Sequence, residues 1–456
     1  MQSYQQRLLW AGGFTFLTLV LGGWFFPKQP ASSMGSDWFW SNKVRPGRQF
    51  EVVVVGDSRI YRGFSPADFK ATYAPDSALS VFNFGFSSAG LDTNFLRAGG
   101  LLLDTTAAMP ILMLGITTSS LADENASNQH FWQEHNRSLA SIWQRQHINP
   151  YLTFFDPTSP NTLRNHWKEE RQGYYQQHYN NGWIASDKQP HTPWETYAHV
   201  QQTYPKVEFS LGFRQHLLQQ IATWQAQGIQ VVAFRPPAAP HLEAIEMLPS
   251  YYPETAIKAT IQALGGIWID FPKREEYTTY DGNHLVEASA RQWSQDLGTL
   301  LRQALQKKKQ RRIIKRQQEN FETLSLGTII EEKSAPTGKK VQALPAKSFS
   351  HTLTYALDTL PFYTLELIAT VQARFPKDTL LKGATLVVSV ENASGMLLWE
   401  GHALVEHMVA PLTWTTVQLS IPYTHQQAGA LLKVYVWNNR EQPILLDDLT
   451  LEISTY

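Results

Sequence analysis

The spacing of apolar residues changes along the 456-residue chain, and this change limits the folds that it can adopt. Between about residues 50 and 305, short apolar runs alternate with helical patterns, as in a parallel sheet covered by helices. From about residue 346 onward, apolar and polar residues alternate, which is typical of antiparallel strands with one buried face. We therefore expect an α/β domain over 50–305 and a β-sandwich over 346–456.

The first region predicts buried strands and helices in alternation. This order predicts a doubly wound sheet whose site lies at the carboxyl ends of the strands. The expected strands are Glu51 to Val55, Leu79 to Phe84, Pro110 to Ile116, Ile229 to Phe234 and Gly266 to Ile269, and the expected helices are Leu91 to Leu103, Phe209 to Gln227 and Glu287 to Gln306.

An uncharged run from Leu8 to Phe26 precedes these domains and would measure roughly 28 Å as a helix. Trp10 and Trp24 lie near its ends, as interfacial anchors would. We predict a transmembrane anchor over 1–27 and a single-pass protein of the inner (cytoplasmic) membrane, with its C-terminal body periplasmic or extracellular. The alternative is a signal peptide that is cleaved near Ala31.

Composition excludes several kinds of chemistry. The chain has no cysteine, so it has no thiolate nucleophile, iron–sulfur cluster or thiolate zinc site. Its 39 Lys and Arg balance 39 Asp and Glu, which argues against nucleic acid as a partner. Since the histidine spacings also fit no metal set, we expect neither a metal nor a cofactor.

Two short motifs fall at the ends of predicted strands. Gly56-Asp57-Ser58-Arg59 follows the first strand, and Asp281-Gly282-Asn283-His284 precedes the last helix. A serine hydroxyl becomes a nucleophile when a histidine takes its proton and a carboxylate orients that histidine. Ser58, His284 and Asp281 are therefore candidate catalytic residues, although each motif by itself is also common as a turn or helix cap.

Together the motifs resemble the first and last blocks of the SGNH/GDSL hydrolase superfamily, over roughly residues 50–300. The resemblance implies a three-layer parallel-sheet domain, a triad of Ser58, Asp281 and His284, and backbone oxyanion donors at Ser58 and Gly85. The family's Gly-x-Asn-Asp block is absent, because the corresponding strand ends Gly115-Ile116-Thr117-Thr118-Ser119. A hydroxyl such as that of Thr117 would replace the missing side-chain donor, and losing one donor typically costs about 3 kcal/mol.

Arg59 and Arg62 follow the candidate nucleophile closely. A guanidinium there would bind an anionic substrate group or the developing oxyanion. We therefore include both as candidate substrate-binding residues, with a structural salt bridge to a loop carboxylate as the equal alternative.

Two further segments are distinctive. Residues 123–207 form an insertion rich in Trp and Tyr, expected either to stack on sugars beside the serine or to pack a small core of their own. Residues 306–345 begin with a basic run, expected as a solvated helix end and linker, or as a contact for anionic lipid.

The region 346–456 resembles jelly-roll carbohydrate-binding modules, with an accessory sandwich that binds nothing as the alternative. Its expected strands are Tyr363 to Val371, Ala384 to Val390, Trp414 to Ile421 and Leu431 to Trp437.

Taken together, these features resemble the membrane-anchored proteins that O-acetylate alginate and other bacterial exopolysaccharides. That resemblance implies a serine acyltransferase or carbohydrate esterase that adds or removes O-acetyl groups on an exported or cell-envelope polysaccharide. It also implies a membrane-bound O-acyltransferase as the partner that supplies the acyl group. The alternative is a catalytically degraded SGNH-fold scaffold that binds glycan in a polysaccharide export or modification complex.

Overall fold

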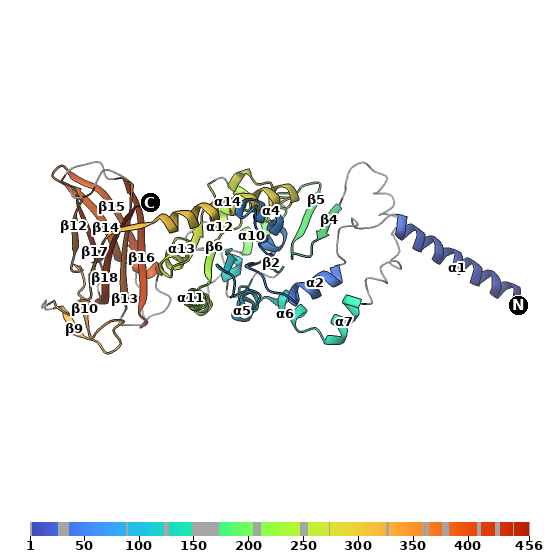
Figure 1. Ribbon diagram of the computed structural model, residues 1–456, viewed down its shortest axis with the longest axis horizontal. Coiled ribbons are helices and arrows are strands. Elements are labelled where there is room, and N and C mark those ends of the chain that lie inside the picture. Colours follow the sequence, from blue (N-terminus) through green and yellow to red (C-terminus); the bar gives the residue numbers. More distant parts are fainter. Residues whose placement is uncertain are drawn as a thin grey trace. The chain divides into compact units, whose positions relative to one another are not determined.

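In the computed structural model (Figure 1) the chain folds into two compact units. Unit 1 comprises 1–209, 234–251 and 269–301, and unit 2 comprises 210–233, 252–268 and 302–456. The residues described are 2–25, 36–87, 90–122, 127–147, 173–203, 211–246, 254–272, 274–324, 328–357, 360, 364–375, 383–407, 412–424, 429–440 and 442–455.

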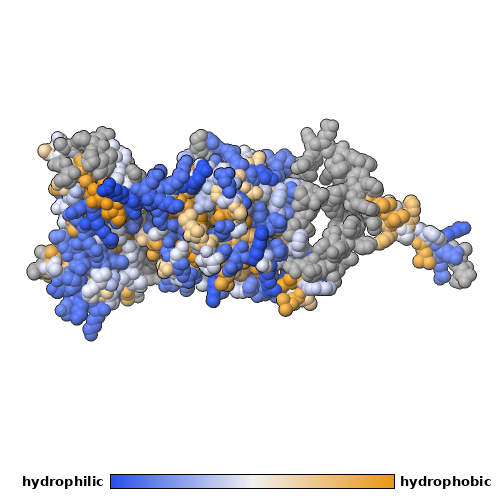
Figure 2. All heavy atoms as spheres, viewed as in Figure 1, coloured by the Kyte–Doolittle hydropathy of each residue, from blue (hydrophilic) through white to orange (hydrophobic). Residues whose placement is uncertain are grey.

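Helix α1 (Gln2–Phe25) covers most of the run for which we predicted a transmembrane anchor. Its exposed side chains include Leu8, Leu9 and Trp10, and Figure 2 shows both apolar and polar residues on its surface. A membrane crossing needs about 20 predominantly apolar residues in one helix. Within the described residues no helix meets that need. The predicted anchor over 1–27, membrane contact through it and inner-membrane localisation are therefore wrong.

A five-stranded parallel sheet has the order β2-β1-β3-β6-β7. Strand β1 lies between β2 and β3 and pairs in parallel with both. Every residue of β1, β2, β3 and β6 is buried, which explains why these segments are largely apolar and do not alternate, with Asn83 and Gln230 as their buried polar residues. The strands are β1 (Val52–Gly56), β2 (Val81–Gly85), β3 (Ile111–Gly115), β6 (Gln230–Phe234) and β7 (Ile267–Ile269).

Side-chain caps begin the helices that follow these strands. The carboxylates of Asp57 and Asp92 and the hydroxyl of Ser65 accept backbone N–H groups at the starts of α3, α5 and α4. The described helices of this region are α2 (Ser36–Val44), α3 (Ser58–Gly63), α4 (Pro66–Tyr73), α5 (Thr93–Leu101), α6 (Gln129–His135), α7 (Leu139–His147), α10 (Tyr197–Thr203), α11 (Leu211–Ala226), α12 (Pro240–Glu246), α13 (Glu254–Ala263) and α14 (Glu287–Gln310).

The described part of the insertion 123–207 contains helices α6, α7 and α10 and an antiparallel hairpin of β4 (Gly173–His178) and β5 (Ile184–Gln189). Trp183 is buried and stacks on Tyr179, whereas Trp143 and Trp194 are exposed. The insertion therefore packs some of its rings internally and presents others to solvent. Trp167, another tryptophan of this insertion, lies outside the described residues.

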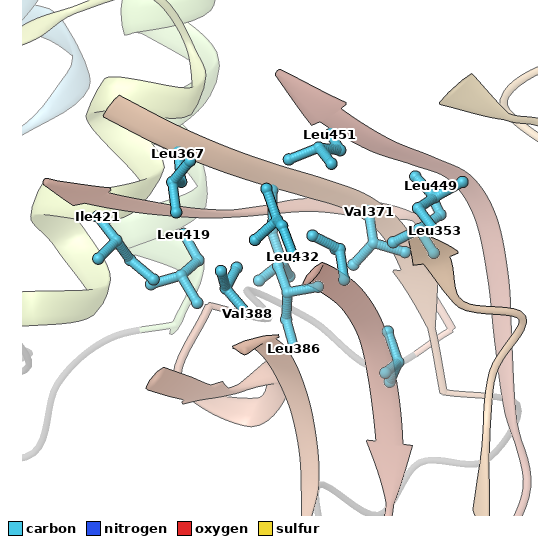
Figure 3. Packing of buried hydrophobic residues seen from close by; sticks show 14 of the residues in the cluster. Leu353, Leu367, Val371, Leu386, Val388, Leu419, Ile421, Leu432, Leu449 and Leu451 are labelled. Atoms are coloured by element: carbon cyan, nitrogen blue, oxygen red, sulfur yellow. The ribbon is translucent and has the colours of Figure 1, made fainter. Parts of the chain in front are cut away.

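The C-terminal part is an antiparallel β-sandwich. One sheet has the order β16-β13-β18-β10-β9 with β8 also on β18, and the other has the order β11-β17-β14-β15 with β12 also on β17. Leu367 and Val371 of one sheet and Leu386, Val388 and Leu432 of the other belong to one buried cluster (Figure 3). The elements are β8 (Arg312–Glu319), β9 (Ile329–Glu331), β10 (Lys340–Leu344), β11 (Ser348–Phe349), β12 (Leu353–Ala356), β13 (Thr364–Arg374), β14 (Ala384–Asn392), β15 (Gly395–Ala403), α15 (Leu404–His407), β16 (Thr415–Thr424), β17 (Leu431–Asn438) and β18 (Ile444–Thr455).

The basic segment differs from the solvated linker that we expected. β8 follows α14 directly and pairs with β18, which places Arg316 opposite Glu452. Arg311 also forms ion pairs with Glu366 and Glu452. Carboxylates on the neighbouring strands thus explain why so charged a segment joins a sheet edge.

The predicted fold class also needs correction. We predicted an SGNH-type three-layer α/β domain with an N-terminal transmembrane helix and a C-terminal sandwich. The structure is mixed and rich in sheet: one parallel sheet accompanies two antiparallel sheets that share a core and a two-stranded hairpin. None of the described helices supplies the membrane-spanning part.

Candidate functional site

Ser58 is the first residue of α3, directly after β1. Asp57 caps this helix by accepting the N–H of Arg59 at 2.9 Å, and the hydroxyl of Thr117 donates to its other carboxylate oxygen at 2.6 Å. A Cβ on Gly56 would lie 2.3 Å from the side chain of Ile60. A glycine at the strand end therefore lets α3 fold back closely and present Ser58 at the carboxyl edge of the sheet.

The structure brings the three predicted catalytic residues together. His284 Nε2 lies 2.8 Å from Ser58 Oγ, and His284 Nδ1 lies 2.7 Å from Asp281 Oδ2. Both distances lie within hydrogen-bonding range. The imidazole thus has one nitrogen on the hydroxyl and the other on the carboxylate, an order suited to proton transfer from the serine.

A tight turn holds the aspartate and the histidine. Asp281 Oδ1 accepts the backbone N–H groups of Asn283 and His284, at 2.9 and 2.8 Å. Gly282 has φ of +90°, and a Cβ there would lie 2.2 Å from the carbonyl oxygen of Pro193. The insertion therefore packs directly against the turn that carries Asp281 and His284, and only glycine fits at this contact.

The pKa shifts favour a neutral histidine beside an ionised aspartate. Burial lowers the pKa of His284, and the nearby positive charges of Arg62 and Arg59 lower it further, although Asp281 opposes them. Burial alone would raise the pKa of Asp281, but hydrogen bonds from His284 outweigh it and the net pKa is lowered. At neutral pH the imidazole is thus unprotonated and able to accept the Ser58 proton.

Two groups that we predicted as oxyanion donors already have other acceptors. The N–H of Gly85 donates to Asn83 Oδ1 at 2.9 Å, and the Thr117 hydroxyl donates to Asp57. Burial raises the pKa of Asp57, although Arg59 and the Thr117 hydrogen bond oppose that shift.

Arg59 connects helix α3, which carries Ser58, to the turn that carries His284. Its Nε donates to Asn283 Oδ1 at 2.7 Å, and its Nη atoms donate to both carboxylate oxygens of the fully buried Glu246. Arg59 is itself buried. The structural salt bridge, our alternative to substrate binding, is thus the arrangement in the structure.

We expect Arg59→Met to lower the free energy of unfolding by about 3–5 kcal/mol, because Glu246 would lose its bidentate partner inside the protein. Urea unfolding measures this loss. Lys188→Met is the matched control, since it breaks a pair with Glu195 that is largely solvated and should cost at most about 1 kcal/mol. Equal, small effects of the two substitutions would contradict the structural role of Arg59.

Arg62 has a different environment, made of tyrosines. Its Nε donates to the hydroxyl of Tyr61 at 2.6 Å, and its Nη1 donates to the hydroxyl of Tyr280. The guanidinium also lies 5.5 Å from the ring centroid of Tyr174, which is 48% exposed. Burial by itself would lower the pKa of Arg62, but the tyrosines outweigh it and the pKa is raised, so this residue stays charged.

Sequence reasoning missed Asn83 and the tyrosines as parts of this site. The Asn83 amide donates to the carbonyl oxygens of Ile60 and Phe64, both at 2.8 Å, and so satisfies the end of α3. An asparagine inside an otherwise apolar strand was the available signal for this role, because buried polar groups need partners. No comparable signal marked Tyr61 or Tyr280.

Aromatic rings also gather on the outer face of the β11-β17-β14-β15 sheet. Phe349 is 59% exposed, and its ring lies 6.1 Å from that of Trp437 and 5.7 Å from that of Tyr435. Tyr435 and Trp437 alternate along β17 with the buried Val434 and Val436. The period of two thus directs these rings away from the core, toward solvent.

Solved structures similar to part of this chain include carbohydrate-binding modules. An arabinose-bound α-L-arabinofuranosidase has a TM-score of 0.20 and 14% identity, over 31% of this chain and 23% of its own. The CBM22-1 xylan-binding domain from Paenibacillus barcinonensis Xyn10C has a TM-score of 0.22 and 16% identity, over 31% of this chain and 94% of its own. The C-terminal CBM6 of LamC from Zobellia galactanivorans has a TM-score of 0.20 and 10% identity, over 31% and 100%. No protein-family model and no curated protein matches this chain.

Proposed function

We propose that this protein is a serine acyltransferase or carbohydrate esterase that moves O-acyl groups, such as acetyl, on a polysaccharide. The observation that carries the proposal is the hydrogen-bonded series Ser58, His284 and Asp281, with contacts of 2.8 and 2.7 Å. Such a series needs a neutral imidazole and an ionised carboxylate, and the pKa of His284 and the pKa of Asp281 are both lowered, which favours these two states.

In the first half-reaction Ser58 Oγ attacks the acyl carbonyl carbon and its proton passes to His284 Nε2. The bond from the carbonyl carbon to the donor oxygen then breaks, and the donor alcohol leaves with that proton. In the second half-reaction an acceptor hydroxyl gives its proton to His284 and attacks the acyl-serine, and Ser58 regains the proton on leaving. A sugar as acceptor gives transfer, and water gives hydrolysis. In this proposal a separate acyltransferase supplies the acyl group that is transferred.

The outer sandwich face supports the choice of a glycan as substrate. Sugar rings bind by laying an apolar face on accessible aromatic side chains, and the exposed Phe349 together with the half-buried Tyr435 and Trp437 provides such rings. Remote binding of this kind lowers the barrier only for acceptors that make the contact. A glycan would thereby have an advantage over water as the acyl acceptor.

A second candidate is a glycan-binding scaffold whose α/β part no longer catalyses. The observation in its favour is that the Gly85 N–H and the Thr117 hydroxyl donate to Asn83 and Asp57 and not toward a substrate. Without two oxyanion donors a serine ester would form very slowly.

Intact-mass measurement after incubation with 4-nitrophenyl acetate tests the two candidates. We expect a gain of one acetyl group on Ser58, and its faster loss when an oligosaccharide acceptor is added, with acetyl found on the sugar. Acetyl that leaves to water at a rate no sugar alters would indicate an esterase. Absence of any acyl-enzyme would contradict the enzyme proposal and favour the scaffold.

A further inference from the structure

We propose that Arg62 binds a carboxylate of the substrate, about one helical turn from Ser58; this inference rests on the proposed function and adds a chemical class to its substrate. Arg62 and Ser58 both lie on α3, four positions apart. Side chains at this spacing share one face of a helix, with Cβ atoms about 5–6 Å apart. An anion on Arg62 would therefore lie within one sugar-ring width of the reacting serine.

The hydrogen bonds of Arg62 leave most of the Nη donors of the guanidinium, which are the donors that bind carboxylates, available for a ligand. Its side chain has five N–H donors. One on Nε goes to Tyr61 and one on Nη1 goes to Tyr280, and no further hydrogen-bond acceptor for it occurs among the described residues. Three donors remain on the two Nη atoms, enough for a bidentate carboxylate.

The surrounding side chains hold this guanidinium in place without neutralising it. Tyr61 and Tyr280 are buried, at 3% and 1% exposure, so their hydroxyls are held in fixed positions. Tyr174 borders the group and is 48% exposed, which leaves one side of the cluster open to solvent. Within the described part of the chain Arg62 forms no ion pair, in contrast to Arg59, which is paired with Glu246.

The positive charge of Arg62 affects His284, the base of the proposed reaction. His284 faces Asp281 and Ser58 through hydrogen bonds, the charges of Arg62, Arg59 and Asp57, and the ring of Tyr280, which stacks on it with centroids 5.7 Å apart. A positive charge on Arg62 opposes the imidazolium that forms when Ser58 loses its proton. A substrate carboxylate on Arg62 would cancel that opposition and so strengthen the base only when the correct substrate is bound.

Two positions on a substrate can supply the carboxylate, and paired esters distinguish them. On the sugar side, an acetylated methyl glucoside is compared with the matching acetylated methyl glucuronoside. On the acyl side, 4-nitrophenyl acetate is compared with 4-nitrophenyl hydrogen adipate. Each pair is assayed with the wild-type protein and with Arg62→Gln, Arg62→Lys and Arg291→Gln. The last is the matched control, because Arg291 is paired with Asp68 and Glu287.

We expect Arg62→Gln to lower the ratio of kcat/KM for the carboxylate ester to that for its neutral partner by about 10-fold or more, in one of the two pairs. Arg62→Lys should restore part of the ratio, since lysine keeps the positive charge but lacks the planar set of N–H donors that binds a carboxylate through two hydrogen bonds. Arg291→Gln should leave the ratio unchanged. Ratios that Arg62→Gln does not alter in either pair would overturn the proposal.

The pH profile supplies a readout that a purely structural role would not affect. Removing the Arg62 charge raises the pKa of His284 in the free enzyme, so the acid limb of kcat/KM should move to higher pH in Arg62→Gln. An acid limb at the wild-type position would contradict the charge argument.

Binding separates failure of this inference from failure of the proposed function. Calorimetric titration of Ser58→Ala protein with the acetylated glucuronoside measures the subsite without chemistry. If Arg62→Gln weakens this binding about 10-fold or more while the wild-type protein forms no acyl-enzyme with 4-nitrophenyl acetate, the subsite stands and the enzyme proposal is rejected. Equal binding with and without the guanidinium would reject the subsite alone.

Discussion

Ser58→Ala is expected to abolish acetyl-ester turnover and acyl-enzyme formation while leaving the fold intact. Ser58 Oγ is the atom that His284 Nε2 contacts at 2.8 Å, and alanine has no hydroxyl to replace it. In enzymes with such a triad, loss of the serine costs on the order of 10⁶ in kcat. Initial rates with 4-nitrophenyl acetate, together with intact mass, measure the effect.

The chain offers a matched control for this substitution. Ser87 also contacts a histidine, with its Oγ 2.7 Å from His130 Nδ1, at the end of the neighbouring strand β2. Burial lowers the pKa of His130 to about 4. We expect Ser87→Ala to keep near-wild-type rates. Retained turnover in Ser58→Ala, or equal losses in both variants, would mean that Ser58 is not the nucleophile.

Asp281→Asn is expected to lower kcat by about 10⁴-fold. The asparagine amide can donate to His284 Nδ1, which would then leave the proton on Nε2, where it opposes Ser58 instead of accepting from it. Because Asp281 also accepts two backbone N–H groups of its own turn, asparagine is a milder change than alanine and keeps one acceptor oxygen.

The control for this prediction is Asp187→Asn. Asp187 contacts His191 at 3.1 Å in a pair whose side chains are 31% and 35% exposed, so it matches the chemistry of the substitution at a site open to water. Its expected effect on kcat is within about twofold, because a solvated pair contributes little. An Asp281→Asn enzyme with near-wild-type kcat would show that the carboxylate does not orient the base.

The positions of most strands and helices in the α/β region could be predicted from the sequence. Each of the four fully buried strands is a short, largely apolar segment, because burial on both faces favours apolar side chains wherever the strand lies in the sheet. The period of two in β13 and β17 similarly reports one buried face. Local pattern suffices in these cases because each side chain responds only to its own exposure.

The membrane prediction shows where such local reasoning fails. An uncharged run does predict a helix, and α1 is one. A bilayer crossing additionally demands sustained hydropathy over the whole length, and no described helix has it. The basic run at 307–316 indicated a solvated helix end and linker. Its first three lysines do form the exposed last turn of α14, but Arg311 pairs with carboxylates of distant strands and β8 joins a sheet.

The sequence sufficed to select Ser58, Asp281 and His284 as residues that lie together, because turns at strand ends leave a local signature. The partners of Arg59, Arg62, Gly85 and Thr117 were not accessible from the sequence. Glu246 lies 187 positions from Arg59, and Tyr280 lies 218 positions from Arg62. Which arginine is neutralised inside the protein, and which keeps donors for a ligand, depends on contacts between segments far apart in the chain. Only the tertiary structure decides these contacts, because a side chain's charge is local whereas its compensation is not.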